Sequence, residues 1–401
     1  MAMAVKRILI LGAGAAGTIA SNKIARELRR EIAKDEVEIT ILDKNDTNVN
    51  QGGFTFIPFG LYTPEDIIRP RSKLISPRVK AVFGDDGEVT HVDLGNREVT
   101  VKSGKKYSYD YLMIALGCRT YPEAVPGLLQ DYNTFYTLEG ALKLRDFVKT
   151  FSKGKIVIMT PEMPIPCPGA PAKFTVLLDN YLRYVRGEDI RKNIEITFLW
   201  PIKGIGPPAY NENVTKIFEE KGIETRREIK VDEVNAERKE VSLASGEKIK
   251  YDFLVTIPPH RGVKALMDSG ITDDKGWLPA DKYTLQYRKS PTESYDEVYI
   301  AGDAGPPEIL KTGIGAHYQA LIIGQNLIND ILGTGVKVPY RGETGCPYVS
   351  SSYTSFTKGE AYMASWTYNK PQEPFSPTKL GWFVYRMYYY IYWDIGIKGL
   401  L

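Results

Sequence analysis

A glycine-rich turn between an apolar strand and a helix constrains the fold of this chain more than any other feature. Residues 7–11 form a short apolar run typical of a buried parallel strand, and residues 12–17, Gly-Ala-Gly-Ala-Ala-Gly, open a helical stretch that reaches about residue 30. A second strand at residues 37–42 ends at Asp43, which follows the last glycine by 26 residues. This order predicts a βαβ unit that binds a dinucleotide.

The glycines of this turn have separate tasks. Gly12 and Gly14 allow a tight turn and a close approach of the backbone to a pyrophosphate, while Gly17 allows the helix to pack closely on the strand. The carboxylate of Asp43 is suited to accept hydrogen bonds from ribose hydroxyls. The residues predicted to bind the cofactor in this half are Gly12, Gly14, Ala15, Ala16, Gly17, Asp43, Lys44 and Gly117. The motif alone leaves open whether the dinucleotide is FAD or NAD.

Composition argues against several other classes of protein. The 401 residues are 43% hydrophobic and 25% charged, an ordinary globular balance for a chain of about two domains. A net charge of +3 argues against nucleic acid as the main partner. Three cysteines are too few for a disulfide scaffold, and three separated histidines predict no metal site.

The chain also repeats itself. Residues 97–115 align with residues 239–257 at a constant offset of 142, and each copy is typical of a hairpin followed by a buried strand. A second strand-helix-strand pattern spans residues 155–200, which favours domain duplication over chance similarity of two hairpins. We therefore predict an α/β fold with two Rossmann-like domains and an added segment: a discontinuous first domain (1–122 and 252–340), an inserted second domain (123–251) and a C-terminal segment (341–401).

The second half of the first domain carries a flavin-type signature. A strand at residues 298–301 ends in Gly-Asp, and a glycine-rich helix start follows at residues 312–316. This pair resembles the flavin-binding half of the glutathione reductase-like flavoproteins with two dinucleotide domains, which implies FAD as the cofactor. By that resemblance Asp303 holds the ribityl chain, and the helix N-terminus faces the pyrimidine edge of the flavin. The residues so implied are Gly302, Asp303, Lys311, Thr312 and Gly313.

The inserted domain lacks the fingerprint that would bind a nicotinamide. Its turn at residues 160–171 is rich in proline, which removes N–H donors and blocks a close backbone approach to a pyrophosphate. Its next strand ends in Trp200 where a ribose-binding acid would stand. Glutathione reductase-like enzymes and type II NADH dehydrogenases carry this second fingerprint, so we expect a different electron donor.

The same turn contains Cys167, shortly before a predicted helix with Pro171 in its first turn. The positive end of that helix and the nearby Lys173 should favour a thiolate at Cys167. Cys346 is expected in a loop of the C-terminal segment, and Cys118 follows a buried strand. Buried, unreactive thiols are the alternative interpretation, above all for Cys118.

The combined pattern resembles the sulfide:quinone oxidoreductase family across essentially the whole chain. Its parts are the FAD fingerprint, Cys-Pro-Gly-Ala-Pro-Ala-Lys at 167–173, Lys-Thr-Gly-Ile-Gly-Ala-His-Tyr-Gln-Ala at 311–320 and Gly-Cys-Pro at 345–347. The resemblance implies that Cys167 and Cys346 are a redox pair that relays sulfur from hydrogen sulfide. It also implies that Cys118 is the third cysteine near the flavin, which some members bond covalently to FAD.

The implied reaction begins when hydrosulfide opens a disulfide or sulfur-bridged cysteine pair and leaves a persulfide on one cysteine. The freed thiolate attacks the flavin, two electrons pass to FAD, and repeated rounds lengthen a polysulfide. Which cysteine attacks the flavin, and whether FAD is covalently bound, stay open. Glu162 is a candidate proton carrier, with a solvated loop acid as the alternative.

Residues 379–401 predict a helix that lies in the plane of a membrane surface. Apolar side chains recur at helical spacing, but Arg386, Asp394 and Lys398 interrupt a stretch long enough to span a bilayer. The tryptophans and tyrosines are residue types that prefer the headgroup layer, and the basic residues are expected to reach anionic lipid. Packing of this helix on its own protein, or on a second subunit of a homo-oligomer, is the alternative.

A lipid-facing helix suits a quinone as electron acceptor. We expect the quinone pocket on the flavin face opposite the cysteines, with Phe356, Phe383 and Tyr385 as candidates for its walls. The chain is then a peripheral, monotopic membrane protein without a cleaved signal peptide, with the cytoplasmic side of the membrane favoured. Two other functions stay open: a flavoprotein sulfide dehydrogenase that reduces cytochrome c, and a cysteine-based flavin redox sensor without turnover.

Overall fold

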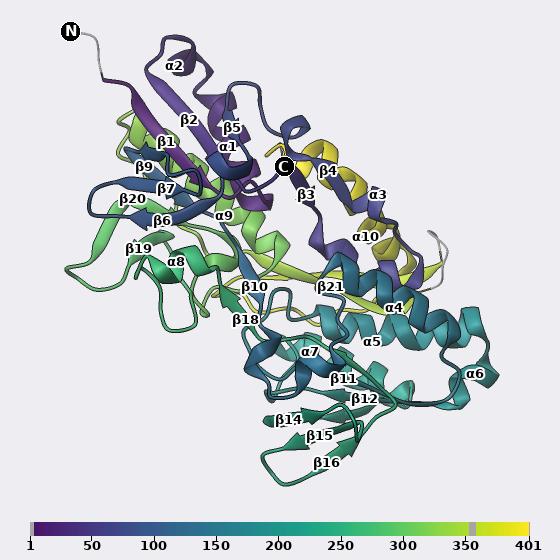
Figure 1. Cartoon of the computed structure of the whole chain (residues 1–401). Helices are drawn as coiled ribbons and strands as arrows, with labels where there is room; N and C mark the ends of the chain where they lie inside the picture. Colours follow the sequence, from purple (N-terminus) through teal and green to yellow (C-terminus); the bar gives the residue numbers. More distant parts are fainter. Residues whose placement is uncertain (1–3, 353–357, 401) are drawn as a thin grey trace.

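The computed structural model describes residues 4–352 and 358–400, which form two α/β lobes with segments crossing between them (Figure 1). The sheet of the first lobe has the strand order β19-β20-β9-β1-β2-β5. β1 pairs in parallel with β2 and with β9, as the βαβ prediction requires, and β19 runs antiparallel to β20. Its strands are β1 (Lys6–Leu11), β2 (Val37–Leu42), β5 (Lys80–Val82), β9 (Tyr111–Ile114), β19 (Gln286–Arg288) and β20 (Ser294–Ile300).

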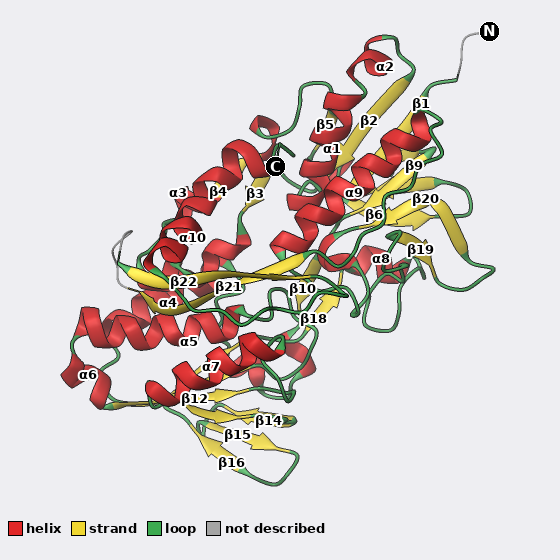
Figure 2. Ribbon diagram, turned by 180° about the vertical axis from the view of Figure 1, so that it is seen from behind, coloured by secondary structure: helices red, strands yellow, loops and turns green. Residues whose placement is uncertain are grey.

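Both faces of this sheet are covered. Ile8 and Ile10 of β1 pack in one core with helices α1 and α9, whereas Leu9 and Leu11 pack in another core with the small sheet β6-β7-β8 (Figure 2). A strand buried on both faces explains the continuous apolar run in the sequence. The covering elements are α1 (Ala15–Glu27), α9 (Gly313–Ile331), β6 (Val89–Asp93), β7 (Glu98–Val101) and β8 (Lys106–Ser108).

The second lobe is built in the same way. Its sheet has the order β13-β12-β11-β17, and a small antiparallel sheet, β14-β15-β16, covers the face opposite α5 and α7. Its strands are β11 (Gly154–Met159), β12 (Ile194–Leu199), β13 (Glu224–Arg226), β14 (Val231–Asn235), β15 (Glu240–Leu243), β16 (Lys248–Lys250) and β17 (Phe253–Thr256). Its helices are α4 (Leu138–Thr150), α5 (Ala170–Tyr181), α6 (Glu188–Lys192) and α7 (Pro208–Glu220).

The repeat detected in the sequence corresponds to equivalent structure in the two lobes. β7, β8 and β9 in the first copy match β15, β16 and β17 in the second, and β17 pairs with β11 as β9 pairs with β1. This pairing corrects one predicted boundary. β17 lies in the sheet of the inserted lobe, so the chain returns to the first lobe after residue 256 and not at residue 252.

The C-terminal segment begins with a two-stranded ribbon that lies between the lobes (Figure 2). It consists of β21 (Thr344–Ser352) and β22 (Gly359–Trp366), and Cys346 pairs with Ala364 within it. The expectation of a loop around Cys346 was therefore wrong. A second short antiparallel pair, β10 (Cys118–Thr120) with β18 (His260–Gly262), places Cys118 in a strand as well.

The last helix, α10 (Lys379–Ile391), has two different faces. Trp382, Tyr385 and Tyr389 point into the protein and are at most 7% exposed. Arg386 is also buried, and it donates to the Leu61 carbonyl oxygen and the Tyr62 hydroxyl at 2.9 and 3.2 Å. The expectation that these aromatic and basic side chains reach the headgroup layer was wrong for this face, because they form part of the protein core.

The opposite face of α10 carries the apolar residues whose helical spacing the sequence revealed. We call this set the outer stripe: Leu380, Phe383, Val384, Met387 and Ile391 of α10, with Ile395 in the helical turn that follows. Leu380 is 70% exposed and Val384 47% exposed, and the remaining members are exposed or half-buried. Within residues 4–352 and 358–400, no helix has both the length and the apolar character that a membrane span needs. Phe356 lies outside the described residues.

The remaining helices and strands are short. They are α2 (Arg29–Ala33), β3 (Thr47–Val49), α3 (Pro64–Ile67), β4 (Ile68–Pro70) and α8 (Lys264–Asp268).

Candidate active site

The glycine turn after β1 has the shape that the motif predicted. Gly12 has φ +96°, and a Cβ on Gly17 would lie 1.9 Å from the Gly12 carbonyl oxygen, so α1 packs directly on the turn. At Gly14 a Cβ would meet nothing within 4 Å. This open side lies at the N-terminus of α1, where Ala15 and Ala16 begin the helix and its first N–H groups lack partners within the helix. The turn therefore fits a pyrophosphate.

Asp43, at the end of β2, is held by two partners. Its Oδ2 accepts a hydrogen bond from the Ala13 N–H at 2.8 Å, and its Oδ1 lies 2.6 Å from a guanidinium nitrogen of Arg71. Arg71 also has a buried Nε that finds no hydrogen-bond partner among the described residues. This cation belongs to the dinucleotide end of the site, although no sequence motif pointed to it. Lys44 is exposed.

Asp303 and Lys311 lie together at the other end of the site. The Asp303 carboxylate accepts no hydrogen bond from a described residue. Burial raises the pKa of Asp303, and the positive charge of Lys311 lowers it by less, so the net pKa is raised. The Lys311 ammonium donates to the carbonyl oxygens of Asp303 and Gly305 at 3.0 and 2.6 Å and lies 4.0 Å from the Trp277 ring centroid. An unpaired carboxylate in this position fits the ribityl hydroxyls that the resemblance assigned to it.

Three further glycines face open space near these groups. A Cβ on Gly117 or Gly313 would meet nothing within 4 Å, and Gly302 has φ +68° with its nearest neighbours at 3.9 Å. Thr312 caps α9, and its hydroxyl accepts from the Gly315 N–H at 2.8 Å. These residues and the turn after β1 therefore fit FAD in the orientation that the sequence implied.

Cys167 and Cys346 meet although they are 179 residues apart in the chain, with their sulfur atoms 3.9 Å apart. A bent bridge through one sulfur atom places its outer sulfurs about 3.3 Å apart, and a disulfide needs about 2.05 Å, so a small approach of the two side chains allows either state. Cys167 has φ +48°, unusual for a residue with a side chain, and its N–H donates to the Lys311 carbonyl oxygen at 2.5 Å. The proline-rich turn is thus tied to the flavin side of the first lobe.

Cys346 has the surroundings of a thiolate. The thiol of Cys167 donates to it, the Lys173 ammonium attracts it, and the Tyr210 hydroxyl and the Gly169 N–H also donate. These contacts outweigh burial and lower the pKa of Cys346 to about 6. The pKa of Cys167 is raised well above its usual value, first by the bond to Cys346 and then by burial. The sequence assigned the thiolate to Cys167, and this geometry favours Cys346 instead.

Cys118 lies apart from this pair, near Asp303 and Lys311. Burial and the Asp303 charge raise the pKa of its thiol well above the usual value, and Lys311 opposes them. Cys118 is therefore a protonated thiol on the flavin side of the site. Within the described residues, no three His, Cys, Asp or Glu side chains gather as a metal site requires.

Comparison with known proteins gives one consistent result. The family described as pyridine nucleotide-disulphide oxidoreductase matches residues 6–158. The mitochondrial sulfide:quinone oxidoreductase of Dictyostelium discoideum is 27% identical, with 98% of this chain and 86% of that protein covered. The sulfide-quinone reductase of Aquifex aeolicus is 24% identical over 81% of this chain and 77% of that protein. This chain is a homologue of the sulfide:quinone oxidoreductases.

A solved structure has the same fold. The sulfide:quinone oxidoreductase from the hyperthermophilic bacterium Aquifex aeolicus superposes with a TM-score of 0.80 at 19% identity, and 99% of this chain and 92% of that chain are covered. The two-lobe α/β architecture predicted from the repeat and the two strand-helix-strand patterns is therefore confirmed. So is the resemblance to the sulfide:quinone oxidoreductase family.

The two described candidates for the quinone site, Phe383 and Tyr385, lie on opposite faces of α10 and cannot line the same pocket wall. Phe383 belongs to the outer stripe and is 42% exposed. Tyr385 points inward, and its hydroxyl accepts a hydrogen bond from the Lys173 ammonium at 2.8 Å. Lys173 also acts on both cysteines, so Tyr385 lies near the cysteine pair.

Glu162 does not have the surroundings of a proton carrier. Its carboxylate forms ion pairs with Arg261, at 3.0 Å, and with Lys275. Burial raises its pKa, but these two partners outweigh burial and the net pKa is lowered. Glu162 is therefore an ionised group that joins the proline-rich turn to the first lobe.

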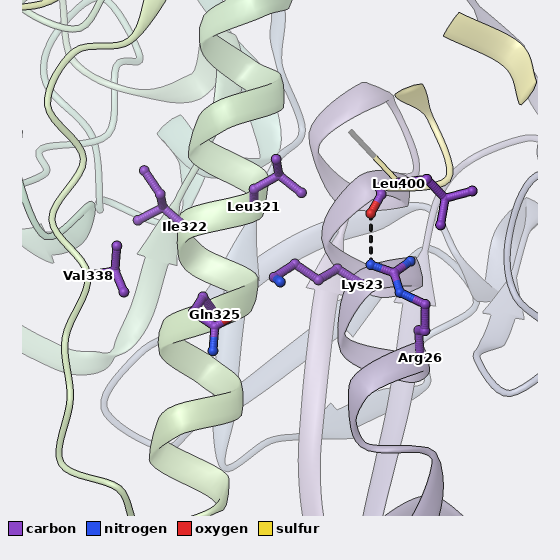
Figure 3. A pocket seen from close by; sticks show the side chains of 8 residues that line it. Lys23, Arg26, Leu321, Ile322, Gln325, Val338 and Leu400 are labelled. Carbon is purple, nitrogen blue, oxygen red and sulfur yellow. Dashed lines mark hydrogen bonds between the residues drawn. The ribbon is translucent and has the colours of Figure 1, made fainter. Parts of the chain in front are cut away.

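Two cavities open near or on these elements. The smaller, about 170 Å³, borders Cys346 and Tyr210 and gives small molecules a place beside the sulfur atoms. The larger, about 440 Å³, lies on α1 and α9 next to the chain end, away from the cysteines (Figure 3). There Arg26 donates to the carbonyl oxygens of Lys398 and Gly399 at 3.2 and 2.8 Å.

Proposed function

We propose that this chain is a sulfide:quinone oxidoreductase that oxidises hydrogen sulfide to zero-valent sulfur or polysulfide and reduces a membrane quinone. The observation that carries the proposal is the Cys167–Cys346 pair, with sulfur atoms 3.9 Å apart: Cys167 lies in the turn where a nicotinamide fingerprint would otherwise stand, and Cys346 reaches it from β21. The pair lies beside residues that fit FAD. The sulfide and quinone activities named for the homologues agree with this arrangement.

The cysteines carry the sulfur chemistry. With the pair oxidised, hydrosulfide attacks one sulfur, a persulfide forms on that cysteine, and the other cysteine leaves as a thiolate. Cys346 is the better leaving group because the Lys173 charge, the Tyr210 hydroxyl and the Gly169 N–H all favour its thiolate. FAD, when bound, accepts the two electrons and supplies them to the quinone. Asp303 and the glycine turn after β1 orient it, and Cys118 is the proposed point of covalent attachment.

The proline-rich turn supports sulfide and not NADH as the donor. In the structure this turn carries Cys167, which bonds to Lys311, and the Tyr136 hydroxyl donates to the Pro166 carbonyl oxygen at 2.9 Å. Trp200 is 1% exposed at the strand end where a ribose-binding acid would stand. These contacts take up the space and the N–H groups that a second pyrophosphate needs.

The outer stripe of α10 supports attachment to one face of a membrane. An exposed apolar stripe on a helix too short to span a bilayer is typical of an in-plane helix. A quinone dissolved in the bilayer then reaches the protein at this helix, with Phe383 as a proposed contact. The proposed protein is peripheral and lies on the cytoplasmic side of the membrane. The outer stripe is also compatible with contact between subunits of a homo-oligomer.

The test is steady-state turnover of the FAD-loaded protein with separate donors and acceptors. We expect sulfide with a short-chain quinone to give rapid quinone reduction, and NADH with the same quinone to give a negligible rate. Cytochrome c in place of quinone should be reduced slowly at most. A cytochrome c rate above the quinone rate would support the dehydrogenase, and no turnover with either acceptor would support a redox sensor.

A further inference from the structure

Lys173 is a buried cation without a carboxylate partner. It stands in the first turn of α5, is 5% exposed, and forms no ion pair with an acidic side chain of the described residues. Its ammonium donates one hydrogen bond, to the Tyr385 hydroxyl at 2.8 Å, and lies 5.0 Å from the centroid of that ring. Neither contact supplies a negative charge.

The acidic groups that act on Lys173 are Cys346, Cys167 and Tyr389. Burial lowers the pKa of Lys173, but attraction to the two cysteines outweighs burial, and the net pKa is raised. A buried ammonium that loses its counter-ion costs several kcal/mol, so the state of the cysteine pair and the charge of Lys173 are coupled. In the reduced pair that counter-ion is the Cys346 thiolate.

Oxidation of the cysteine pair removes this counter-ion. A disulfide or sulfur-bridged pair is neutral, while Lys173 remains buried beside it. The cavity that borders Cys346 is lined by Tyr210, Thr312 and apolar or glycine residues, and no lysine or arginine of the described residues lines it. Lys173 is buried and attracts Cys346, which borders the cavity, so a small anion beside Cys346 experiences the field of this ammonium with little screening by water.

We propose that Lys173 is the charge partner that draws hydrosulfide, rather than neutral hydrogen sulfide, to the oxidised cysteine pair. It then stabilises the Cys346 thiolate that the attack releases. One negative charge enters as hydrosulfide and the same charge is left on Cys346, so the ammonium regains a counter-ion when hydrosulfide enters and keeps one after the attack. Tyr385 positions Lys173 through its hydroxyl. This inference rests on the proposed function and assigns Lys173 a part in it.

Other titratable groups face the same cysteines and must be separated from Lys173. They are Tyr136, Tyr210, Tyr385 and Asp303, and Tyr389 faces Lys173 itself. The tyrosines are neutral at ordinary pH because burial raises the pKa of each. Asp303 is an acid, and its negative charge disfavours a thiolate. Lys173 is therefore the one positive charge among the described groups that act on the cysteine pair.

The test compares Lys173→Met with Lys173→Arg in the FAD-loaded protein. The first readout is the pH titration of the ultraviolet thiolate absorbance of the reduced protein, corrected by the Cys346→Ser variant. We expect Lys173→Met to raise the midpoint by about 1 to 3 pH units and Lys173→Arg to restore most of the shift. Lys216→Met, whose lysine side chain is 77% exposed on α7, is the matched control and should leave the midpoint unchanged.

The second readout is steady-state kinetics with sulfide and quinone. Lys173→Met should raise KM for sulfide by about tenfold or more and leave KM for quinone unchanged, because about tenfold corresponds to one pH unit of lost attraction. If Lys173→Met does not retain FAD, Lys173→Gln keeps a donor for Tyr385 and takes its place. A wild-type midpoint and a wild-type KM for sulfide in these variants would overturn the inference. The thiolate titration needs no turnover, so an inactive wild-type protein would count against the proposed function alone.

Discussion

Gly169 stands where any side chain would collide with the sulfur of Cys346. A Cβ on Gly169 would lie 2.2 Å from the Cys346 Sγ and 2.8 Å from the Tyr210 hydroxyl. Gly169 is also the N-cap residue of α5. The missing side chain therefore brings the positive end of a helix against the thiolate, which lowers its pKa.

Gly169→Ala should consequently lose most of its sulfide oxidation and keep FAD. The added methyl group displaces the Cys346 sulfur from the Gly169 N–H and from Cys167, while the glycine turn after β1 is untouched. Gly204→Ala is the control in the same lobe, because the nearest atom to its Cβ is 3.5 Å away. Equal sulfide turnover in both alanine variants would mean that the contact has no role.

Cys167→Ser and Cys346→Ser should each bind FAD and fail to couple sulfide to quinone. The relay needs both sulfurs, whereas the cofactor residues lie elsewhere. Flavin absorbance measures FAD retention, and the rate of quinone reduction measures coupling. Turnover at the wild-type rate in either serine variant would exclude the two-cysteine relay.

The fold could be predicted from local patterns because parallel strands buried on both faces leave apolar runs, and the glycine turn has a fixed geometry. The sequence places a hairpin before β9 and before β17 alike, so the repeat itself assigns β17 to the second sheet, and the predicted boundary at residue 252 separated this strand from its own copy of the repeat. Repeats locate equivalent elements better than composition does.

The charge distribution of the site could not be predicted in the same way. Lys173 and Pro171 are close to Cys167 in sequence, and this favoured a thiolate there. Tyr210, however, reaches Cys346 from a different helix, a contact between residues 136 positions apart. A similar long-range contact joins Arg71 to Asp43. Neither pair has a spacing that a sequence motif encodes.

His260 should make the protein sensitive to acid. It is buried, its Nδ1 hydrogen-bonds to the Pro258 carbonyl oxygen at 2.8 Å, and burial lowers its pKa to about 4. The unfolded chain, with a histidine pKa of about 6.5, binds the proton first as pH falls. Stability is therefore lost from about pH 6.5 down to about pH 4, and the loss at about pH 5 is about 2 kcal/mol.

The thermal midpoint of the wild type and of His260→Gln, measured at about pH 7 and about pH 5, checks this effect. The wild type should lose more on acidification than the variant, because other titrating groups cancel in the difference. If the thermal midpoints of the wild type and of His260→Gln fall equally on acidification, groups other than His260 cause the acid sensitivity.

Membrane attachment should depend on the outer stripe and not on the inward aromatic face of α10. Leu380→Glu with Val384→Glu should weaken binding to anionic vesicles by about tenfold or more, through lost apolar burial and added repulsion, with FAD retained. Val336→Glu removes an apolar side chain that is 56% exposed away from α10 and is the matched control. Sedimentation with vesicles measures binding. If the double variant sediments with vesicles as well as the wild type does, the outer stripe does not contact the membrane.

The most direct measurement is anaerobic mixing of the FAD-loaded protein with one donor at a time, without an acceptor. Sulfide should bleach the flavin rapidly in the wild type and much more slowly in Cys346→Ser, and NADH at the same concentration should leave the flavin oxidised. Rapid bleaching by NADH, or bleaching of Cys346→Ser by sulfide at the wild-type rate, would contradict the account.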